Sequence, residues 1–100
     1  MKLPIPFDEE KIKDFCRRWK IAEFSLFGSV LREDFGPESD VDVLVAFEPD
    51  SGITFNNRVE MLDELVAIFG REVDLVEKDL IRNPFRRHEI LKTKEVIYAA

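Results

Sequence analysis

The chain has 100 residues, of which 45% are hydrophobic and 36% charged, and its formal net charge is -6. This length suits one domain with a single core, and the composition is that of a globular protein, which excludes a disordered or fibrous chain. The acidic balance argues against a general nucleic-acid binder, because such proteins carry a basic surface that replaces the counterions of the phosphate backbone.

Neither a signal peptide nor a membrane span is expected. No long apolar core follows the first six residues, and the longest hydrophobic run falls far short of the roughly 20 residues of a membrane-spanning helix. We therefore expect a cytoplasmic protein. Cys16 is the single cysteine, which excludes an internal disulfide and any zinc site built from several cysteines.

The first predicted helix runs from an N-cap at Asp8 to about Lys20. Acidic residues follow the cap, where the helix dipole favours negative charge. Apolar residues recur at i, i+3, i+4 and i+7 and form one stripe: Ile12, Phe15, Cys16 and Trp19. The stripe favours a packing role for Cys16, since a reactive thiol needs an accessible, electropositive setting.

A strand over residues 21–27 is predicted to end in a turn at Gly28 and Ser29. Glycine has no Cβ and tolerates positive φ angles, so the backbone of this turn can approach a phosphate closely. If a helix begins here, the N–H groups of its first turn also point at the anion, and the Ser29 hydroxyl adds a donor. The turn therefore predicts a phosphate-binding site.

The second predicted strand, residues 41–47, opens beside two carboxylates. Asp40 and Asp42 project to one side while Val41 and Val43 point into the core, because side chains alternate along a strand. Adjacent like charges are unfavourable unless compensated, and Mg²⁺ takes one or two carboxylates together with substrate phosphates. The spacing therefore predicts a pair of divalent ions at Asp40 and Asp42. The alternative is a hydrophobic strand with two acidic residues at its mouth that bind nothing.

Two polar residues between the turn and the second strand are further candidates. Arg32 can reach a triphosphate oxygen with its fork of donors, or it can pair with an acidic residue of the segment 33–38. Ser39 can orient a neighbouring carboxylate or cap the loop. The residues themselves leave both choices open.

A turn-rich loop at residues 48–52 precedes a predicted helix from about Thr54 to Phe69, which Gly70 terminates. The stripe expected to cover one face of the sheet consists of Phe55, Val59, Leu62, Leu65, Val66 and Phe69. Residues 71–77 alternate as a third strand, with Asp74 on its polar side. We assign the helix over residues 54–69 a scaffolding role.

The last predicted helix begins after an N-cap at Asn83, with Pro84 at its first position, and runs to about Leu91 or Lys92. Residues 95–99 are short and apolar enough for a final strand or a docked tail.

Gly28-Ser29, ten intervening residues and Asp40-Val41-Asp42 resemble the signature of the DNA polymerase β-like nucleotidyltransferase superfamily. The short length and the stretch LFGSVLREDFGPESDVDVLVAF resemble the minimal nucleotidyltransferases, the MntA-type antitoxins that pair with HEPN toxins. The resemblance covers nearly the whole chain. It implies one nucleotidyltransferase domain over residues 1–100 with an α/β fold, a small mixed β-sheet flanked by helices.

The resemblance also implies a reaction. Such proteins transfer a nucleoside monophosphate, AMP from ATP, to a tyrosine hydroxyl of the HEPN toxin and so disable it. Two Mg²⁺ ions about 3.5–4 Å apart would clamp the attacking and leaving oxygens. The carboxylates that match those of the family are Asp40, Asp42 and Asp74, with Asp74 as the general base that also helps to hold metal. The nucleotide-binding residues implied are Gly28, Ser29, Arg32 and Ser39.

Other functions remain open at this point. A non-catalytic antitoxin would inhibit its partner by occlusion and keep nucleotide binding as a relic. Transfer to a small molecule is the weaker possibility, since no second domain is expected to present one. Neither a membrane nor a direct nucleic-acid contact is expected, and the motif does not specify the base of the nucleotide.

Overall fold

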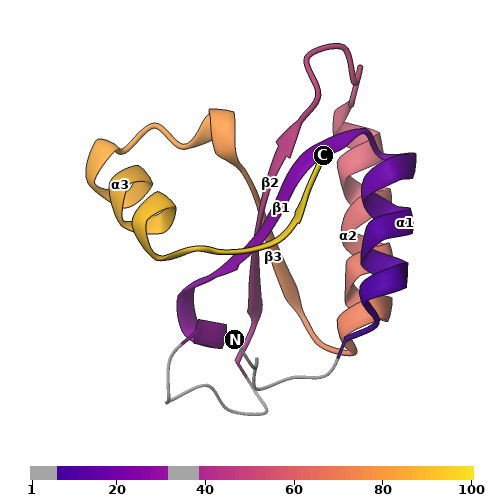
Figure 1. Ribbon diagram of the computed structural model, residues 1–100, viewed down its shortest axis with the longest axis horizontal. Coiled ribbons are helices and arrows are strands. Elements are labelled where there is room, and N and C mark those ends of the chain that lie inside the picture. Colours follow the sequence, from indigo (N-terminus) through magenta and orange to yellow (C-terminus); the bar gives the residue numbers. More distant parts are fainter. Residues whose placement is uncertain (1–6, 32–38) are drawn as a thin grey trace.

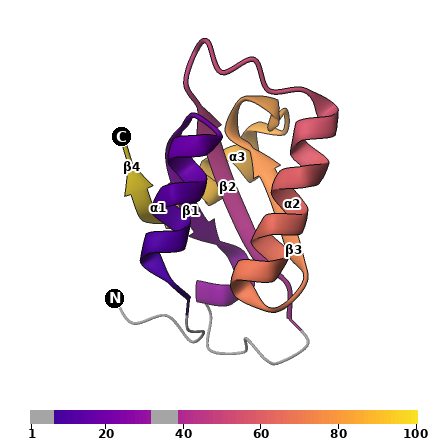
Figure 2. The same ribbon diagram turned by 90° about the vertical axis from the view of Figure 1, so that its right-hand side faces the viewer.

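The computed structural model describes residues 7–31 and 39–100. Within these residues a four-stranded mixed sheet has α1 (Glu9–Arg18) and α2 (Phe55–Phe69) on one face and α3 (Pro84–Thr93) on the other (Figures 1 and 2). The predicted α/β class, a small mixed sheet flanked by helices, is confirmed. No helix in the described part of the chain is long and apolar enough to cross a membrane.

The strands lie in the order β3-β2-β1-β4. Their bounds are β1 (Ile21–Phe27), β2 (Val41–Phe47), β3 (Val73–Glu77) and β4 (Glu95–Ala99). β1 runs antiparallel to both β2 and β4, whereas β2 and β3 are parallel and are joined by the crossover helix α2. The predicted bounds of the second and last strands are confirmed, and the last segment is a strand rather than a docked tail. β3 is therefore one edge of the sheet and β4 is the other.

The prediction that the third strand begins at Arg71 was wrong by two residues, since β3 begins at Val73. The two preceding residues instead hold the approach to β2. The Glu72 carbonyl accepts a hydrogen bond from the Val41 N–H at 3.0 Å, and the Arg71 guanidinium donates to the Ser39 carbonyl at 3.3 Å.

The larger core lies between the sheet and the helices α1 and α2. The predicted stripe of α1 packs there, with Ile12, Phe15 and Cys16 buried and Trp19 half-buried. Burial raises the pKa of the Cys16 thiol to about 12, against a smaller lowering by the Arg17 charge. The full burial of Cys16 in this core confirms the packing role.

The first helix ends at Arg18, two residues before the predicted end. Lys20 has a φ of +54°, a left-handed conformation that cannot continue an α-helix. Its carbonyl then accepts a hydrogen bond from the Glu48 N–H at 2.9 Å. The turn between α1 and β1 is thereby tied to the end of β2.

The predicted apolar stripe of α2 was partly wrong. Leu65 and Phe69 are buried as expected, but Phe55 is 76% exposed and Val59 is 48% exposed. Met61, which the sequence pattern did not select, is fully buried in their place. The helix therefore contacts the sheet through a stripe rotated from the predicted one. Its ends agree with the prediction, with Thr54 as N-cap and Gly70 as C-cap at φ +72°.

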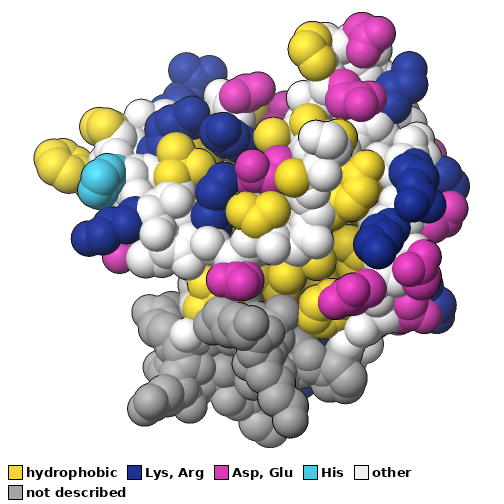
Figure 3. All heavy atoms as spheres, viewed as in Figure 1, with side chains coloured by type: hydrophobic (Ala, Val, Ile, Leu, Met, Phe, Trp, Pro, Cys, Tyr) yellow, Lys and Arg dark blue, Asp and Glu magenta, His cyan; other side chains and the backbone are white. Residues whose placement is uncertain are grey.

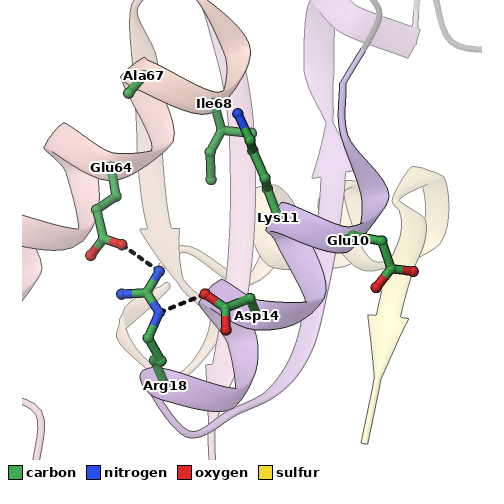
Figure 4. Close-up of a pocket in the computed structure, with 7 residues that line it drawn as sticks. All are labelled: Glu10, Lys11, Asp14, Arg18, Glu64, Ala67 and Ile68. Carbon is green, nitrogen blue, oxygen red and sulfur yellow. Dashed lines mark hydrogen bonds and ion pairs between the residues drawn. The ribbon is translucent and has the colours of Figure 1, made fainter.

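An ion-paired network joins α1 to α2. Arg18 donates to Asp14 at 2.8 Å and to Glu64 at 2.6 Å, and the Trp19 indole N–H donates to Glu64 at 2.8 Å. Figure 4 shows Asp14, Arg18 and Glu64 around a shallow groove of about 480 Å³ that Ala67 and Ile68 also line. The network links the two helices at the surface, above the core that packs them together.

A smaller core lies on the other face of the sheet. It consists of Phe27, Leu44, Ile81 and Ile90, with Val76 and Leu91 packed against it. Asn83 caps α3 through hydrogen bonds from the N–H groups of Phe85 and Arg86, and Pro84 occupies the first position as predicted. α3 ends at Thr93, one or two residues beyond the predicted end. Thus α3 covers the face of the sheet that lies opposite to α1 and α2.

Candidate active site

The turn after β1 brings Gly28 against the carboxylate of Asp42. Phe27 and Asp42 are register partners in the antiparallel pair, so the turn lies beside the first residues of β2. Gly28 has a φ of +73°, and a Cβ built on it would lie 2.2 Å from Asp42 Oδ2. A side chain at this position is thus excluded by backbone conformation and by the carboxylate. Gly28 therefore lies against an acidic oxygen, and its approach to a phosphate stays a prediction.

The segment after this turn, for which a helix was one alternative, is one short 3₁₀ element, η1 (Gly28–Leu31). Ser29 lies in η1, and its side chain is outside what the structure describes. Arg32 lies outside the described residues altogether. The roles predicted for these two side chains, a phosphate donor at Ser29 and a phosphate contact or an ion pair at Arg32, therefore stay predictions.

Asp42 and Asp74 are brought side by side by the parallel pair β2 and β3, in which they are register partners. Neighbouring strands are about 4.8 Å apart, and paired residues point to the same face. That face is opposite to the one on which Val41 and Val43 are fully buried. The third carboxylate, which sequence analysis placed on a later strand, is thus the direct neighbour of Asp42.

Asp40 and Ser39 form the approach to β2. Asp40 is exposed and Ser39 is half-buried, and neither belongs to the strand. The Arg71 bond to the Ser39 carbonyl fixes this segment at the end of α2. Sequence analysis missed Arg71, which it assigned only to a strand. No pattern in the sequence links positions 39 and 71, because the contact arises from the crossover.

Asp74 is favoured over the acidic residues near it in the sequence. Glu77 has the alternation phase of Val73 and Leu75, and its carboxylate lies 3.9 Å from Arg58 of α2. Asp79 lies beyond β3 in the short element η2 (Lys78–Leu80). Asp74 alone among these three is paired with Asp42.

The oxygen donors suit a hard divalent cation. Within residues 7–31 and 39–100, no group of three His, Cys, Asp or Glu side chains forms a ready-made metal cage. Magnesium does not need one, since it binds through one or two carboxylates and completes its shell with substrate phosphates and water. Asp42 and Asp74 on adjacent strands, with Asp40 at the strand mouth, are a donor set of that kind.

A second polar group lies farther along the same face of the sheet. The Lys94 ammonium donates a short hydrogen bond to the Glu23 carboxylate, and the fully buried Ser25 hydroxyl donates to the same carboxylate at 3.4 Å. The bond from Lys94 lowers the pKa of Glu23 below its usual range. Sequence analysis missed this group, although Glu23 and Ser25 do alternate with the buried Phe24 and Leu26.

Comparison with known proteins identifies the family of this chain. The family model of the nucleotidyltransferase domain matches residues 9–97. The protein adenylyltransferase MntA of Thermococcus cleftensis is 31% identical over 86 residues, which cover 86% of this chain and 82% of that protein.

Two solved structures share the fold. A toxin-antitoxin structure with AMP-PNP has a chain with a TM-score of 0.73 and 21% identity, over 93% of this chain and 74% of that one. A chain in the structure of the tri-AMPylated Shewanella oneidensis HEPN toxin in complex with MNT antitoxin has a TM-score of 0.65 and 20% identity, over 92% of this chain and 70% of that one. The chain therefore belongs to the nucleotidyltransferase domain family, as a minimal nucleotidyltransferase homologous to the MntA-type protein adenylyltransferases.

Proposed function

We propose that this chain is a Mg²⁺-dependent protein adenylyltransferase that transfers AMP from ATP to a tyrosine hydroxyl of a HEPN toxin and so acts as an antitoxin. The observation that carries the proposal is the position of Asp42, which contacts the Gly28 turn on one side and pairs with Asp74 on the other. Phosphate, metal and acceptor sites would then meet at one end of β2. The relative named as a protein adenylyltransferase and the structural neighbours with AMP-PNP and with a tri-AMPylated HEPN toxin support this choice of reaction, substrate and partner.

In this proposal Asp40, Asp42 and Asp74 hold two Mg²⁺ ions. The ions supply charge neutralisation of the triphosphate and of the displaced pyrophosphate. The backbone of Gly28 and the hydroxyl of Ser29 bind the phosphates. Arg32 and Ser39 complete the nucleotide site, with Ser39 held in place by Arg71.

Asp74 acts as the general base that accepts the proton of the acceptor hydroxyl. Its place on the edge strand β3 and its exposed side chain suit an acceptor that a second protein presents from outside. Its neighbour Asp42 is less exposed and lies one strand further in. Because of this difference in exposure, we assign Asp74 to the acceptor and Asp42 to the nucleotide.

The proposal includes the setting of the reaction. The family match over residues 9–97 supports one nucleotidyltransferase domain spanning residues 1–100. We expect it to work in the cytoplasm, with a HEPN protein as its macromolecular partner and no direct contact with nucleic acid, in keeping with the net charge of -6.

The test is intact-mass spectrometry of the partner HEPN protein after incubation with this chain, Mg²⁺ and each nucleoside triphosphate in turn. We expect the partner to gain one or more AMP units with ATP, and Mn²⁺ to replace Mg²⁺. Asp42→Asn should abolish the gain. Asp74→Asn should retain nucleotide binding and lose transfer, because the base acts after the nucleotide is bound.

An antitoxin that works by occlusion alone is the competing function. The Asp40→Asn and Asp42→Asn variants separate the two, in an assay of the ribonuclease activity of the partner. Inhibition that survives in both variants, without a mass gain on the partner, would show that catalysis is not needed.

A further inference from the structure

A cavity of about 600 Å³ lies next to Gly28, on the face of the sheet that α3 covers. Its walls come from the end of β1, from η1, from the last turns of α3 and from the start of β4. The side chains that line it are Phe27, Leu31, Glu89, Ile90, Thr93 and Glu95. Its size falls within the range of roughly 300–1,000 Å³ that is usual for small-molecule sites.

The floor of this cavity is apolar and fixed in place. Phe27 and Ile90 are 6% and 5% exposed and belong to the smaller core, where they pack with Leu44 and Ile81. Phe27 also supplies an aromatic side chain, the kind of surface on which nucleobases stack. The floor therefore suits a flat, uncharged ring system.

The polar groups at its rim are hydrogen-bond acceptors. The Thr93 hydroxyl gives its single proton to the Glu89 carbonyl at 2.8 Å, so that its oxygen can only accept from a ligand. Within the described ranges, no ion pair or hydrogen bond joins the carboxylates of Glu89 and Glu95 to another side chain. A ligand at this rim must bring donors, and the carboxylates repel any phosphate.

Gly28 joins this cavity to the proposed phosphate site. Gly28 lines the cavity and also lies against the Asp42 carboxylate. A molecule that extends from one site into the other must carry negative charge at the Gly28 end, where metal offsets it, and neutral donors at the end near Glu89 and Glu95. A nucleoside triphosphate whose base bears an exocyclic amine has that distribution of charge and donors.

We propose that this cavity holds the nucleoside of the substrate, and that Glu89 and Glu95 select a purine with an exocyclic amino group. The inference rests on the proposed function, since it takes the phosphates to lie at the Gly28 turn. Glu89 and Glu95 are then specificity residues rather than catalytic ones. They contact the base, and the phosphates and metal remain with the three aspartates.

The test compares three magnesium complexes by titration calorimetry on the full chain: ATP, the purine ribonucleoside triphosphate that lacks the 6-amino group, and inorganic tripolyphosphate. ATP should bind at least about tenfold more tightly than the analogue that lacks the amine, because a hydrogen bond to a charged acceptor is lost. Glu89→Gln and Glu95→Gln should reduce this preference and leave tripolyphosphate binding unchanged. Glu60→Gln, which removes an exposed carboxylate from α2, is the matched control and should change neither.

A steric variant tests the cavity without changing charge. Thr93→Phe should weaken ATP binding at least about tenfold by filling the cavity, while tripolyphosphate still binds. Its thermal unfolding must remain cooperative. Ala67→Phe, which adds the same ring at an exposed position of α2 on the other face of the sheet, should bind ATP as the parent does.

The inference is overturned if ATP and the analogue without the amine bind equally well, or if the Glu89, Glu95 and Thr93→Phe variants transfer AMP at the parental rate. That second result would leave the proposed function intact. Conversely, ATP binding that needs this cavity, without any mass gain on a HEPN partner, would overturn the transfer and keep the nucleoside site. Failure of ATP to bind at all would contradict both the nucleoside site and the proposed function.

Discussion

The two faces of the central sheet carry side chains of different kinds. The face under α1 and α2 is apolar except at the end of β3, where Glu77 pairs with Arg58. Its fully or almost fully buried strand residues include Ile21, Phe24, Leu26, Val41, Val43 and Val45. The face toward α3 carries Glu23, Ser25, Asp42 and Asp74 beside the apolar Phe27 and Leu44. A charge in an apolar layer is costly unless it is paired, and Glu23, Asp42 and Asp74 lie on the face that leaves access to partners, ligands and water. The first face maintains the fold, and the second is available for chemistry.

The strongest test of this comparison removes apolar volume from the first face. Phe24→Ala deletes a fully buried ring that packs edge-to-face on Phe15, and it should lower the free energy of unfolding by about 3–5 kcal/mol. Urea denaturation measures the loss. Phe85→Ala, the same change at a side chain that is 85% exposed, should stay within about 0.5 kcal/mol of the parent. Equal losses in the two variants would contradict the division between faces.

The next largest effect is expected at the turn on the second face. Gly28→Ala places a Cβ 2.2 Å from Asp42 Oδ2, which is too close for both atoms, so the carboxylate must move. A displacement of about 1 Å at a catalytic group can cost on the order of 100-fold in rate, and we expect AMP transfer to fall by about that factor. Mass spectrometry of the HEPN partner over time measures it.

Gly70→Ala is the matched control for this variant. Gly70 has nearly the same φ, +72°, but a Cβ built there meets nothing within 4 Å. Both variants should lose about 1–2 kcal/mol of stability from the left-handed conformation, and only Gly28→Ala should lose transfer. A similar loss of transfer in Gly70→Ala would show that backbone strain, and not the contact with Asp42, explains the effect.

A smaller effect is expected from the buried pair on the second face. Lys94→Met leaves the half-buried Glu23 without its main partner and should cost about 1–3 kcal/mol at pH 7. The pKa of Glu23 is lowered in the folded chain, so the stabilisation is present above the usual glutamate value and is lost as the pH falls through the folded value. The difference between parent and variant should therefore shrink between pH 5 and roughly pH 3.

Thermal unfolding across this pH range measures that difference. Lys92→Met, a change at an exposed position of α3, serves as the control and should follow the parent at every pH. A gap for Lys94→Met that stays constant down to pH 3 would mean that lost packing, rather than the charge pair, accounts for the cost.

The smallest effect is expected from the network between α1 and α2. Arg18→Met removes the bonds to Asp14 and Glu64, but the Arg18 side chain is 49% exposed. Exposed ion pairs contribute about 0–1 kcal/mol and weaken with salt. Urea denaturation should show a difference in free energy of unfolding between parent and Arg18→Met that falls within this range and decreases at high salt. Arg17→Met, the control, should show no difference from the parent. A loss of more than about 2 kcal/mol in the free energy of unfolding would contradict the prediction, because it would mean that the network contributes as a buried ion pair does.

Local signals were sufficient to predict most elements. The alternation in residues 41–47 gave the bounds of β2, the short apolar run 95–99 gave those of β4, and the caps at Asp8 and Asn83 gave the starts of α1 and α3. These signals depend on neighbours a few residues apart. The spacing of Gly28 and Asp42 also predicted a shared site, because a strand, a turn and a returning strand bring such residues together.

The stripe of α2 shows where local signals are insufficient. Phe55 and Val59 have the same helical spacing as the buried residues, yet Met61 is buried and they are exposed. Periodicity gives the existence of an apolar face but not the angle at which the helix lies on the sheet. That angle depends on the whole packing of α1, α2 and the strands.

The sequence alone determined the element types, the α/β class and the candidate carboxylates Asp40 and Asp42, because each of these depends on short-range periodicity, caps and one motif. Asp74 became a candidate only through the family resemblance. Only the tertiary structure decided which of these residues meet. The parallel pairing of β2 and β3 places Asp74 beside Asp42, and the crossover places Arg71 at Ser39. The packing of α3 and β4 against the end of β1 forms the cavity next to Gly28. Contacts of this kind join residues that are tens of positions apart, and they follow from strand order and helix packing rather than from any local pattern.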